Sequence, residues 1–484
     1  MTRVVVVGNG MAGSRLVEEL GRSGRGLGLQ VTVLGAEEQP AYNRVLLSDV
    51  LSGKRHRDEI ALPAAGPGVL VRTGTTVASL DRSARTVTAS DGSTTPYDVL
   101  VLATGSAALV PHVQGIAGPD GSLLAGVHVF RTLEDCARIT AAAGPGVRVV
   151  VVGGGLLGLE AARGLLGQGA QVDVVHGPDH LMDMQLDPTG GAVLRRAVEG
   201  LGVGVHTGSY AAGVTGGRRV TGVRLADGRQ VAAVVVVLAC GIRPEVSLAR
   251  SAGLEVDRAV VVDDELRTSD PHVFALGECA QHRGTVYGLV GPAWEQATVL
   301  ADVIVGRSAA YTGSRTVTRL KAMDLDLAAM GDVVPELTDC GDGVEVLVFV
   351  DPVRRVYKKL VVTDGVVTGA VLLGDLSTAG PLTQAYDRAT PLPAERLHLL
   401  FAGLGRARDV APADLADAAA VCTCNAVTAG AVRACAARTV AEVALATRAT
   451  TGCGGCRPLV EALLAGPPRT PPAPLENAQQ KRSA

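Results

Sequence analysis

The sequence predicts an α/β fold in which one doubly wound unit occurs twice. Four consecutive valines, Val4–Val7, are typical of a strand buried on both faces, and they run into the glycine-rich segment Gly8–Gly13. A second valine run, Arg148–Val152, leads in the same way into Gly153–Gly158. In both places a helix-like stretch and a second apolar strand follow, which is the order of elements that a doubly wound parallel sheet requires.

The first glycine-rich segment has the residues that a dinucleotide site needs. In Gly8-Asn9-Gly10-Met11-Ala12-Gly13, the first glycine permits a tight turn, the second lets backbone approach a pyrophosphate, and the third lets helix and strand pack closely. The helix that follows, Ala12–Leu20, offers free N–H groups and a positive dipole end to phosphates. The second strand, Gln30–Leu34, ends beside Glu37 and Glu38, and an acid there can accept hydrogen bonds from a ribose. This context favours a dinucleotide site over a plain glycine-rich turn.

The later landmarks also recur in order. The region Val69–Val101 is expected to be an antiparallel sheet with a hairpin at Asp91-Gly92, and it closes on Ala103-Thr104-Gly105. In the second unit a strand at Gln171–His176 and a hairpin at Asp227-Gly228 precede the closing segment Ala239-Cys240-Gly241. An internal repeat of this kind predicts two dinucleotide sites.

Composition narrows the class of protein. The net charge is −3 and there is no basic stripe with interleaved aromatic residues, so a nucleic-acid partner is not expected. The apolar strands are too short and too often broken by glycine to span a bilayer, and the N-terminus lacks the layout of a signal peptide. A cytoplasmic location without membrane attachment is therefore expected. A chain of 484 residues is long enough for three or four domains.

Four of the nine cysteines lie close together near the C-terminus. Cys422-Thr423-Cys424 and Cys453-Gly454-Gly455-Cys456 flank residues 425–452, in which Ala429–Ala446 is expected to form a helical spacer. Thiolates suit a zinc ion or an iron–sulfur cluster, and spacing does not choose between them. Disulfides are the third alternative, but a clustered set in a chain without an export signal indicates a metal or redox centre first. Cys435 is expected to be buried in the spacer helix, and the four other cysteines, which lack ligand spacing, are expected in the core or near the cofactor of the first dinucleotide site: Cys136, Cys240, Cys279 and Cys340.

A late strand, Pro271–Cys279, ends in Gly277-Glu278, and this pair carries a family resemblance. It resembles the glycine–acid pair of flavoprotein reductases of the glutathione-reductase type, which have two dinucleotide-binding domains and in which the pair, usually Gly-Asp, meets the ribityl chain of FAD. Disulfide reductases place a C-x4-C pair in the first helix, whereas the first cysteine here is Cys136. The segment Pro40–Ser48 instead resembles the one beside the flavin in ferredoxin reductases and, more closely, in the large subunit of assimilatory NAD(P)H nitrite reductase. Further stretches support that match: Leu181-Met182 with Gln185-Leu186-Asp187, His282-Arg283-Gly284, Val286–Leu289, and Leu320-Lys321 with Met323.

The resemblance implies a domain order, which the repeat also supports. Residues 1–110 and 243–310 would form the FAD-binding domain, and 111–242 the inserted NAD(P)-binding domain. A small α+β domain would follow at 311–408, in which Lys321, Tyr357, Lys358 and Lys359 are expected to be solvated surface residues, with steering of an acidic partner as the alternative. Residues 409–465 would form a small helical [2Fe–2S] domain, because Thr451–Cys456 resembles the second loop of bacterioferritin-associated ferredoxin. A tail at 466–484 is expected to be disordered because it is rich in proline.

The resemblance also implies roles for individual residues. Arg44, in the segment beside the flavin, and Glu160, which resembles the glutamate that approaches the nicotinamide, are the candidate catalytic residues; Glu160 has an ordinary first-turn acid as its alternative. His176 stands where NADH enzymes usually have an acid. The remaining candidates for cofactor binding are Gly8, Gly10, Met11, Ala12, Gly13, Glu37, Ala103, Thr104, Gly105, Gly153, Gly155, Leu157, Gly158, Gly241, Gly277 and Glu278. The candidate cluster ligands are Cys422, Cys424, Cys453 and Cys456.

The expected function follows from these parts. Reduced nicotinamide, NADH in preference to NADPH, would pass a hydride to FAD, and single electrons would leave through a [2Fe–2S] cluster. Nitrite reductase large subunits continue into a sirohaem module whose cysteines this sequence lacks, so we expect an electron-transfer subunit for a separate nitrate or nitrite reductase catalytic subunit. Alternatives are a ferredoxin or rubredoxin reductase, the flavoprotein subunit of an amine or amino-acid oxidase or dehydrogenase, and, as a non-enzyme, a flavin- and nucleotide-binding redox sensor with zinc.

Overall fold

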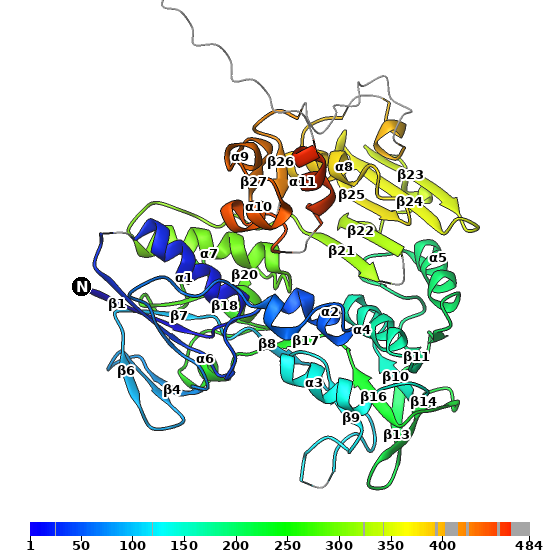
Figure 1. Ribbon diagram of the computed structural model, residues 1–484, viewed down its shortest axis with the longest axis horizontal. Coiled ribbons are helices and arrows are strands. Elements are labelled where there is room, and N and C mark those ends of the chain that lie inside the picture. Colours follow the sequence, from blue (N-terminus) through cyan, green and yellow to red (C-terminus); the bar gives the residue numbers. More distant parts are fainter. Residues whose placement is uncertain are drawn as a thin grey trace, which may run out of the picture. The chain divides into compact units, whose positions relative to one another are not determined.

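The computed structural model describes residues 1–24, 26–118, 120–322, 325–341, 343–392, 395–401, 415–422, 425–452 and 455–465. The chain forms two compact units, Met1–Arg406 and Ala407–Ala484 (Figure 1). No helix in these described ranges combines the length and the apolar character needed to cross a lipid bilayer. The expected tail, 466–484, lies outside the described residues.

A five-stranded parallel sheet organises the first doubly wound part of the larger unit. In spatial order its strands are β19 (Val273–Ala275), β7 (Val99–Leu102), β1 (Thr2–Val7), β2 (Leu29–Leu34) and β3 (Leu70–Arg72). Helices α1 (Met11–Ser23) and α7 (Val290–Ile304) lie side by side and pack into the same core (Figure 1). Because parallel strands end at one edge of a sheet, the segments that follow β1, β7 and β19 meet there.

The second doubly wound part repeats this arrangement, which confirms the predicted fold class. Its parallel strands are, in order, β12 (Gly204–His206), β11 (Gln171–Val175), β10 (Arg148–Val152), β16 (Val235–Leu238) and β9 (Val127–Val129). The helices of this part are α3 (Leu133–Ala142), α4 (Leu156–Gly167) and α5 (Pro188–Glu199). The chain enters and leaves it through β8 (Ser106–Ala108) and β17 (Ile242–Pro244), which pair as an antiparallel ribbon.

Each doubly wound part carries a small antiparallel sheet. The first contains β4 (Val77–Asp81), β5 (Thr86–Ala89) and β6 (Thr94–Pro96), and the second contains β13 (Ala211–Gly216), β14 (Val220–Leu225) and β15 (Gln230–Ala232). The prediction of antiparallel pairing throughout Val69–Val101 is wrong at both ends, because β3 and β7 join the parallel sheet. The apolar run of β7 does not alternate, since both of its faces are buried. Shorter elements complete the region: η1 (Arg44–Leu46), α2 (Leu47–Leu51), η2 (Arg57–Ile60), α6 (Ser247–Ser251), β18 (Val260–Val262), η3 (Gly277–Cys279) and β20 (Ala280–His282).

An antiparallel sheet with one main helix follows in the larger unit. Its spatial order is β21 (Val317–Ala322), β22 (Leu325–Gly331), β25 (Val366–Leu373), β24 (Val356–Thr363) and β23 (Val344–Asp351). Helix α8 (Ala379–Arg388) packs against β22 and β25, while α4 and α5 of the second doubly wound part contact β21 and β24. Two short turns, η4 (Leu337–Asp339) and η5 (Leu397–Leu399), lie at its margins. The central strands are therefore covered on both faces.

Because the central strands are covered on both faces, the expectation that Tyr357, Lys358 and Lys359 are solvated is wrong. All three side chains are buried, with exposed fractions of 0–1%. Successive residues of a strand point to opposite faces, and both faces of β24 are covered, so two adjacent lysines are buried together. Each ammonium has partners: Lys358 Nζ donates to Asp375 Oδ2 and Leu400 O, both at 2.6 Å, and Lys359 Nζ donates to Asp187 Oδ2 and Val333 O, both at 2.8 Å. The side chain of Lys321 lies outside the described residues.

The smaller unit is mainly helical. It contains β26 (Ala420–Cys422), β27 (Val427–Thr428), α9 (Ala429–Ala434), α10 (Val440–Thr447) and α11 (Arg457–Ala465), packed around a small valine-rich core. The expected continuous helix at Ala429–Ala446 is wrong, because Ala436 has a positive φ of 51° and Thr439 starts a new helix with a capping box to Glu442. Cys435 therefore sits half-buried at the end of α9 instead of inside a helix.

Candidate functional site

The first glycine turn combines two tightly packed glycines with an open one. A Cβ on Gly8, whose φ is +115°, would lie 2.1 Å from Ala103 O, and a Cβ on Gly13 would lie 2.1 Å from Gly8 O. A Cβ on Gly10 would meet nothing within 4 Å. The outer glycines are thus required by the close approach of strand, turn and helix, while the middle one faces open space.

The second glycine turn has the same geometry. A Cβ on Gly153, whose φ is +120°, would lie 2.2 Å from Ala239 O, and a Cβ on Gly158 would lie 1.9 Å from Gly153 O. A Cβ on Gly155 would meet nothing within 4 Å. Helices α1 and α4 begin at these turns, and neither has a side-chain cap or an acid in its first turn. Uncapped N–H groups at a positive dipole end fit the phosphates of a dinucleotide.

The closing segments of the first sheet meet at its glycine turn. Gly277 has a φ of +79°, and a Cβ there would lie 2.9 Å from Ala12 Cβ on the first turn of α1. The Gly277 N–H donates to Gln296 Oε1 at 2.7 Å, which fixes this turn from α7. Gly105 lies next to Glu278, with 4.0 Å between its Cβ position and Glu278 Oε2. The fold therefore brings together three candidate segments: 8–13, 103–105 and 277–278.

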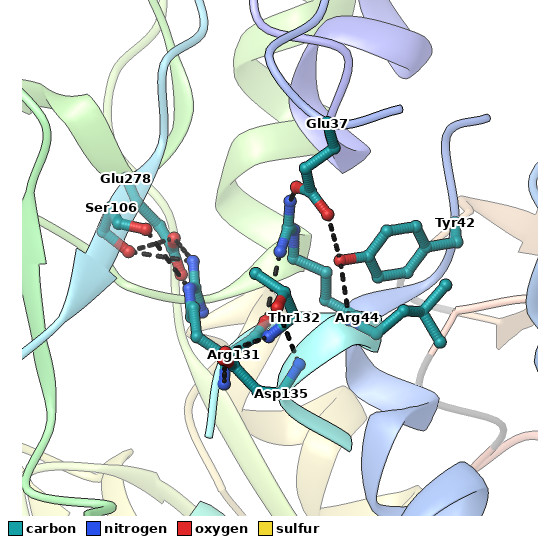
Figure 2. Close-up of polar contacts among 9 residues, drawn as sticks. Glu37, Tyr42, Arg44, Ser106, Arg131, Thr132, Asp135 and Glu278 are labelled. Carbon is teal, nitrogen blue, oxygen red and sulfur yellow. Dashed lines mark hydrogen bonds and ion pairs between the residues drawn. The ribbon is translucent and has the colours of Figure 1, made fainter. Parts of the chain in front are cut away.

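Glu37 and Arg44 form one ionic cluster at this edge (Figure 2). The Glu37 carboxylate pairs with the Arg44 guanidinium and accepts a hydrogen bond from Tyr42 Oη at 2.7 Å. Burial raises the pKa of the Tyr42 phenol well above its ordinary value, so the hydroxyl stays a donor. A carboxylate has further lone pairs, so Glu37 can still accept from ribose hydroxyls.

Glu278 forms a matching cluster with Arg131 (Figure 2). Arg131 pairs with the Glu278 carboxylate and donates to Ser106 Oγ at 2.8 Å, and Ser106 Oγ donates to Glu278 Oε2 at 2.6 Å. Arg44 Nη1 donates to the Arg131 carbonyl at 3.1 Å, which links the two clusters. Each of the two candidate acids is thus neutralised by one arginine.

Arg131 was missed from the sequence, although a local signal marks its position. Thr132 and Asp135 form a capping box at the start of α3, and Asp135 Oδ2 accepts from the N–H groups of Arg131 and Thr132 at 3.0 and 2.9 Å. The spacing T-x-x-D identifies the helix start and so places the preceding arginine in the linker between β9 and α3. Only the three-dimensional structure shows that this linker, which follows β9 of the second sheet, lies beside Glu278, which follows β19 of the first sheet.

The candidate residues of the second site lie around the second glycine turn. Leu157 lies half-buried in the first turn of α4, and Glu160, the fifth residue of the helix, lies half-buried in the next turn. The alternative that Glu160 is a first-turn acid is therefore wrong. Gly241 has a φ of +105°, and a Cβ there would meet nothing within 4 Å. His176 directly follows β11 and is buried, with Nδ1 accepting from Gly154 N–H and Nε2 facing Asp183. The backbone arrangement suits a second dinucleotide, while the roles of these side chains remain predictions.

Two of the four candidate cluster ligands are described, Cys422 and Cys456. Neither is in a disulfide. The Cys456 thiol, and next the N–H groups of Asn425 and Thr450, lower the pKa of Cys422 to about 6 in spite of its burial. Thr450 N–H also donates to Cys456 Sγ at 3.1 Å, and Asn425 Nδ2 lies 3.7 Å from Cys422 Sγ. Convergent thiols with aimed N–H groups fit a centre with thiolate ligands; Cys424 and Cys453 lie outside the described residues.

The other cysteines differ from one another in burial. Cys136 and Cys279 are buried, and Cys240 is half-buried next to the second glycine turn, where its Sγ donates to Val152 O at 3.3 Å. Cys340 is exposed, so its expected place in the core or near a flavin is wrong; it follows η4 at the margin of the antiparallel sheet.

Comparison with known proteins decides the family. Residues 2–297 match the model of the pyridine nucleotide-disulphide oxidoreductases. The chain belongs to this family. Residues 317–390 match the rubredoxin NAD+ reductase C-terminal domain, and residues 420–466 match the BFD-like [2Fe–2S] binding domain. As a pyridine nucleotide-disulphide oxidoreductase with this extra domain, the protein is an oxidoreductase whose cofactors are FAD, a pyridine nucleotide and a [2Fe–2S] cluster.

Its relatives include two Bacillus subtilis proteins. The chain is 37% identical to nitrite reductase [NAD(P)H] over 96% of its own length and 57% of that protein, and 35% identical to the assimilatory nitrate reductase electron transfer subunit over 96% and 59%. It therefore spans less than two thirds of either relative. Among solved structures, the covalent putidaredoxin reductase–putidaredoxin complex is similar with a TM-score of 0.72 at 25% identity, covering 81% of this chain and 94% of that one.

Proposed function

We propose that this oxidoreductase takes electrons from NAD(P)H and delivers them, through its FAD and [2Fe–2S] centre, to a separate catalytic subunit of nitrate or nitrite reduction. The observation that carries the proposal is the combination, on one chain, of the reductase match at 2–297 with the cluster-domain match at 420–466. The printed name of the second B. subtilis relative, an electron transfer subunit, supports the separate partner. The cytoplasmic location expected from the sequence is part of this proposal.

The residues have distinct tasks in this proposal. The turn Gly8–Gly13, with Met11 and Ala12 at the start of α1, and the acids Glu37 and Glu278 would hold FAD, with Arg44 and Arg131 fixing the acids. The turn Gly153–Gly158 would hold the nicotinamide nucleotide, with Glu160 near its reactive ring. When bound, FAD converts the two-electron hydride into single electrons. The protein supplies positions and charges, and no general base is needed.

The domain boundaries belong to the same proposal. FAD would be held by 1–110 with 243–310, the nucleotide by 111–242, and the cluster by 409–465. The pairing of β8 with β17 supports a nucleotide-binding insertion, since the two connections between the doubly wound parts lie side by side.

An anaerobic titration of the purified holoprotein with NADH and then NADPH tests the proposal. We expect the flavin absorbance to bleach and a rhombic electron paramagnetic resonance signal of a reduced [2Fe–2S] cluster to appear. A Cys456→Ser variant is the control, because it should keep flavin reduction and lose or alter the cluster signal. A flavin that neither nucleotide reduces would overturn the reductase function.

A stand-alone ferredoxin or rubredoxin reductase is the second candidate. The match of 317–390 to the rubredoxin NAD+ reductase C-terminal domain favours it. Reduction rates with ferredoxin, rubredoxin and a nitrate reductase catalytic subunit as acceptors distinguish the two. If the Cys456→Ser variant reduces ferredoxin or rubredoxin as fast as the wild type does, direct electron transfer from the flavin to a small carrier is favoured.

A further inference from the structure

The second dinucleotide site has a histidine where an NAD site ordinarily has an acid. An acid after the second strand accepts a hydrogen bond from the ribose 2′-hydroxyl of NAD, and a nearby arginine accommodates the 2′-phosphate of NADP. His176 directly follows β11, whose neighbour β10 leads into the glycine turn. A histidine is neither group, so any discrimination between the two nucleotides must come from its surroundings.

Both ring nitrogens of His176 are already used. Gly154 N–H donates to Nδ1 at 3.1 Å, and Nε2 lies 3.0 Å from Asp183 Oδ1. A backbone N–H can only donate, so Nδ1 must be the unprotonated nitrogen, and Nε2 carries the proton that is donated to Asp183. The ring is uncharged in this arrangement and has no nitrogen left for a ribose.

Asp183 is held in place by the segment that precedes it. Met182 N–H donates to Gly154 O at 3.0 Å, and Met182 is buried with a positive φ of 55°. Leu181 and His176 pack so closely on Gly154 that a Cβ there would lie 2.6 and 2.8 Å from their atoms. The segment is thus clamped to the glycine turn and sets the Asp183 carboxylate at the end of β11, with 30% of its side chain exposed.

The chain segment that contains Asp183 is acidic. Residues 176–187 contain no arginine or lysine, and Asp179 in this segment is exposed. His180 points its Nδ1 to Leu181 O at 3.2 Å. Arg195, on α5, pairs with Glu199 at 2.8 Å and donates to Thr207 Oγ1 at 3.3 Å.

We propose that this site selects NADH over NADPH, and that Asp183, held through His176, determines the selection. The carboxylate takes over the task of the missing acid from a later position in the chain. It can accept from a ribose 2′-hydroxyl, whereas a 2′-phosphate would bring two negative charges against Asp183 and Asp179. This inference rests on the proposed function, because it concerns the nucleotide that the reductase uses.

The test measures kcat/KM for NADH and NADPH with ferricyanide as acceptor, and the Kd of NAD+ and NADP+ for the oxidised holoprotein by calorimetry. We expect the wild type to favour NADH by about 100-fold, the scale expected of like charges brought close together. Asp183→Asn should narrow this ratio by about tenfold, chiefly by improving KM and Kd for the phosphorylated nucleotide.

Two further variants separate selection from structural damage. His176→Glu in the Asp183→Asn background returns a carboxylate to the end of β11 and should restore the preference for NADH. Asp173→Asn removes the matched histidine–carboxylate pair on the same strand, where His206 Nε2 lies 2.9 Å from Asp173 Oδ1, and should leave the ratio unchanged.

The outcomes distinguish this inference from the proposed function. Equal use of NADH and NADPH by the wild type, or an unchanged ratio in Asp183→Asn, would overturn the selection by Asp183 while flavin reduction stands. If neither nucleotide reduces the flavin, the proposed function fails, and the two Kd values still decide the selection.

Discussion

Replacing Lys359 with methionine probes the buried ion pair that joins β24 to the start of α5. Lys359 is 1% exposed and the Asp187 side chain 13% exposed. Asp187 also accepts from Tyr357 Oη at 2.5 Å and from Gly190 N–H at 2.8 Å. Burial raises the pKa of Asp187, but the hydrogen bonds from Gly190, Lys359 and Tyr357 outweigh it, so the net shift is downward.

The expected cost follows from what is left behind. Removing one partner of a buried pair costs about 3–5 kcal/mol, because the other charge stays buried. Asp187 keeps two of its three donors here, so we expect about 3 kcal/mol, the lower end. Lys359→Met with Asp187→Asn should cost less than the two single changes together, with a coupling of about 1–3 kcal/mol.

Urea unfolding and hydrogen–deuterium exchange of β24 and α5 peptides measure this cost. The matched control is Arg354→Met, because Arg354 forms an exposed pair with Asp351 at 2.9 Å, where about 0.5 kcal/mol or less is expected. A Lys359→Met variant as stable as this control would refute the reasoning that the ammonium is held in the interior.

Three further predictions address the cofactor sites and the thiols. Gly8→Ala should destabilise the protein by about 3 kcal/mol or more in thermal unfolding, because the new Cβ would meet Ala103 O and the φ of this residue is positive. Gly10→Ala should leave stability nearly unchanged and weaken FAD retention. Equal losses of stability in the two variants would contradict the distinction between a tightly packed Gly8 and an open Gly10. Asn425→Ala should lower the reduction potential of the cluster in a redox titration, because an N–H donor to Cys422 Sγ is lost; an unchanged potential would exclude that role. Burial raises the pKa of Cys136 to about 12 and that of Cys240 to about 11, so both thiols ionise at a lower pH in the unfolded chain than in the folded protein. The free energy of unfolding should therefore fall as the pH rises above about 9, and it should fall less steeply in Cys136→Ala. An equally steep fall in that variant would count against a contribution from the buried Cys136 thiol.

Most of the fold could be predicted because its signals are local and repeated. The valine runs of β1 and β10 and the two glycine turns fix strand, turn and helix without reference to the rest of the chain. The third glycine of each turn is required by contacts within its own segment. Such features are readable from spacing alone.

The failures concern contacts between distant segments. Nothing in the sequence near Lys358 and Lys359 shows that α5 covers one face of β24. The two lysines therefore favoured the prediction of a solvent-exposed strand. Arg131 could not be assigned because its partner, Glu278, comes from a strand that rejoins the first sheet much later. The break at Ala436 was hidden because alanine seldom adopts a positive φ, and only the capping box at Thr439 marks the new helix.

The β8–β17 ribbon has a consequence for engineering. Because β8 and β17, the entry and exit strands of the second doubly wound part, are hydrogen-bonded neighbours, both splice points lie within one short antiparallel ladder. A homologous insertion with the same two ends can be grafted between Ala108 and Ile242 while the first sheet keeps all five of its strands. Such a graft must still supply the two ionic contacts that this part makes with the rest of the protein, Arg131 with Glu278 and Asp187 with Lys359.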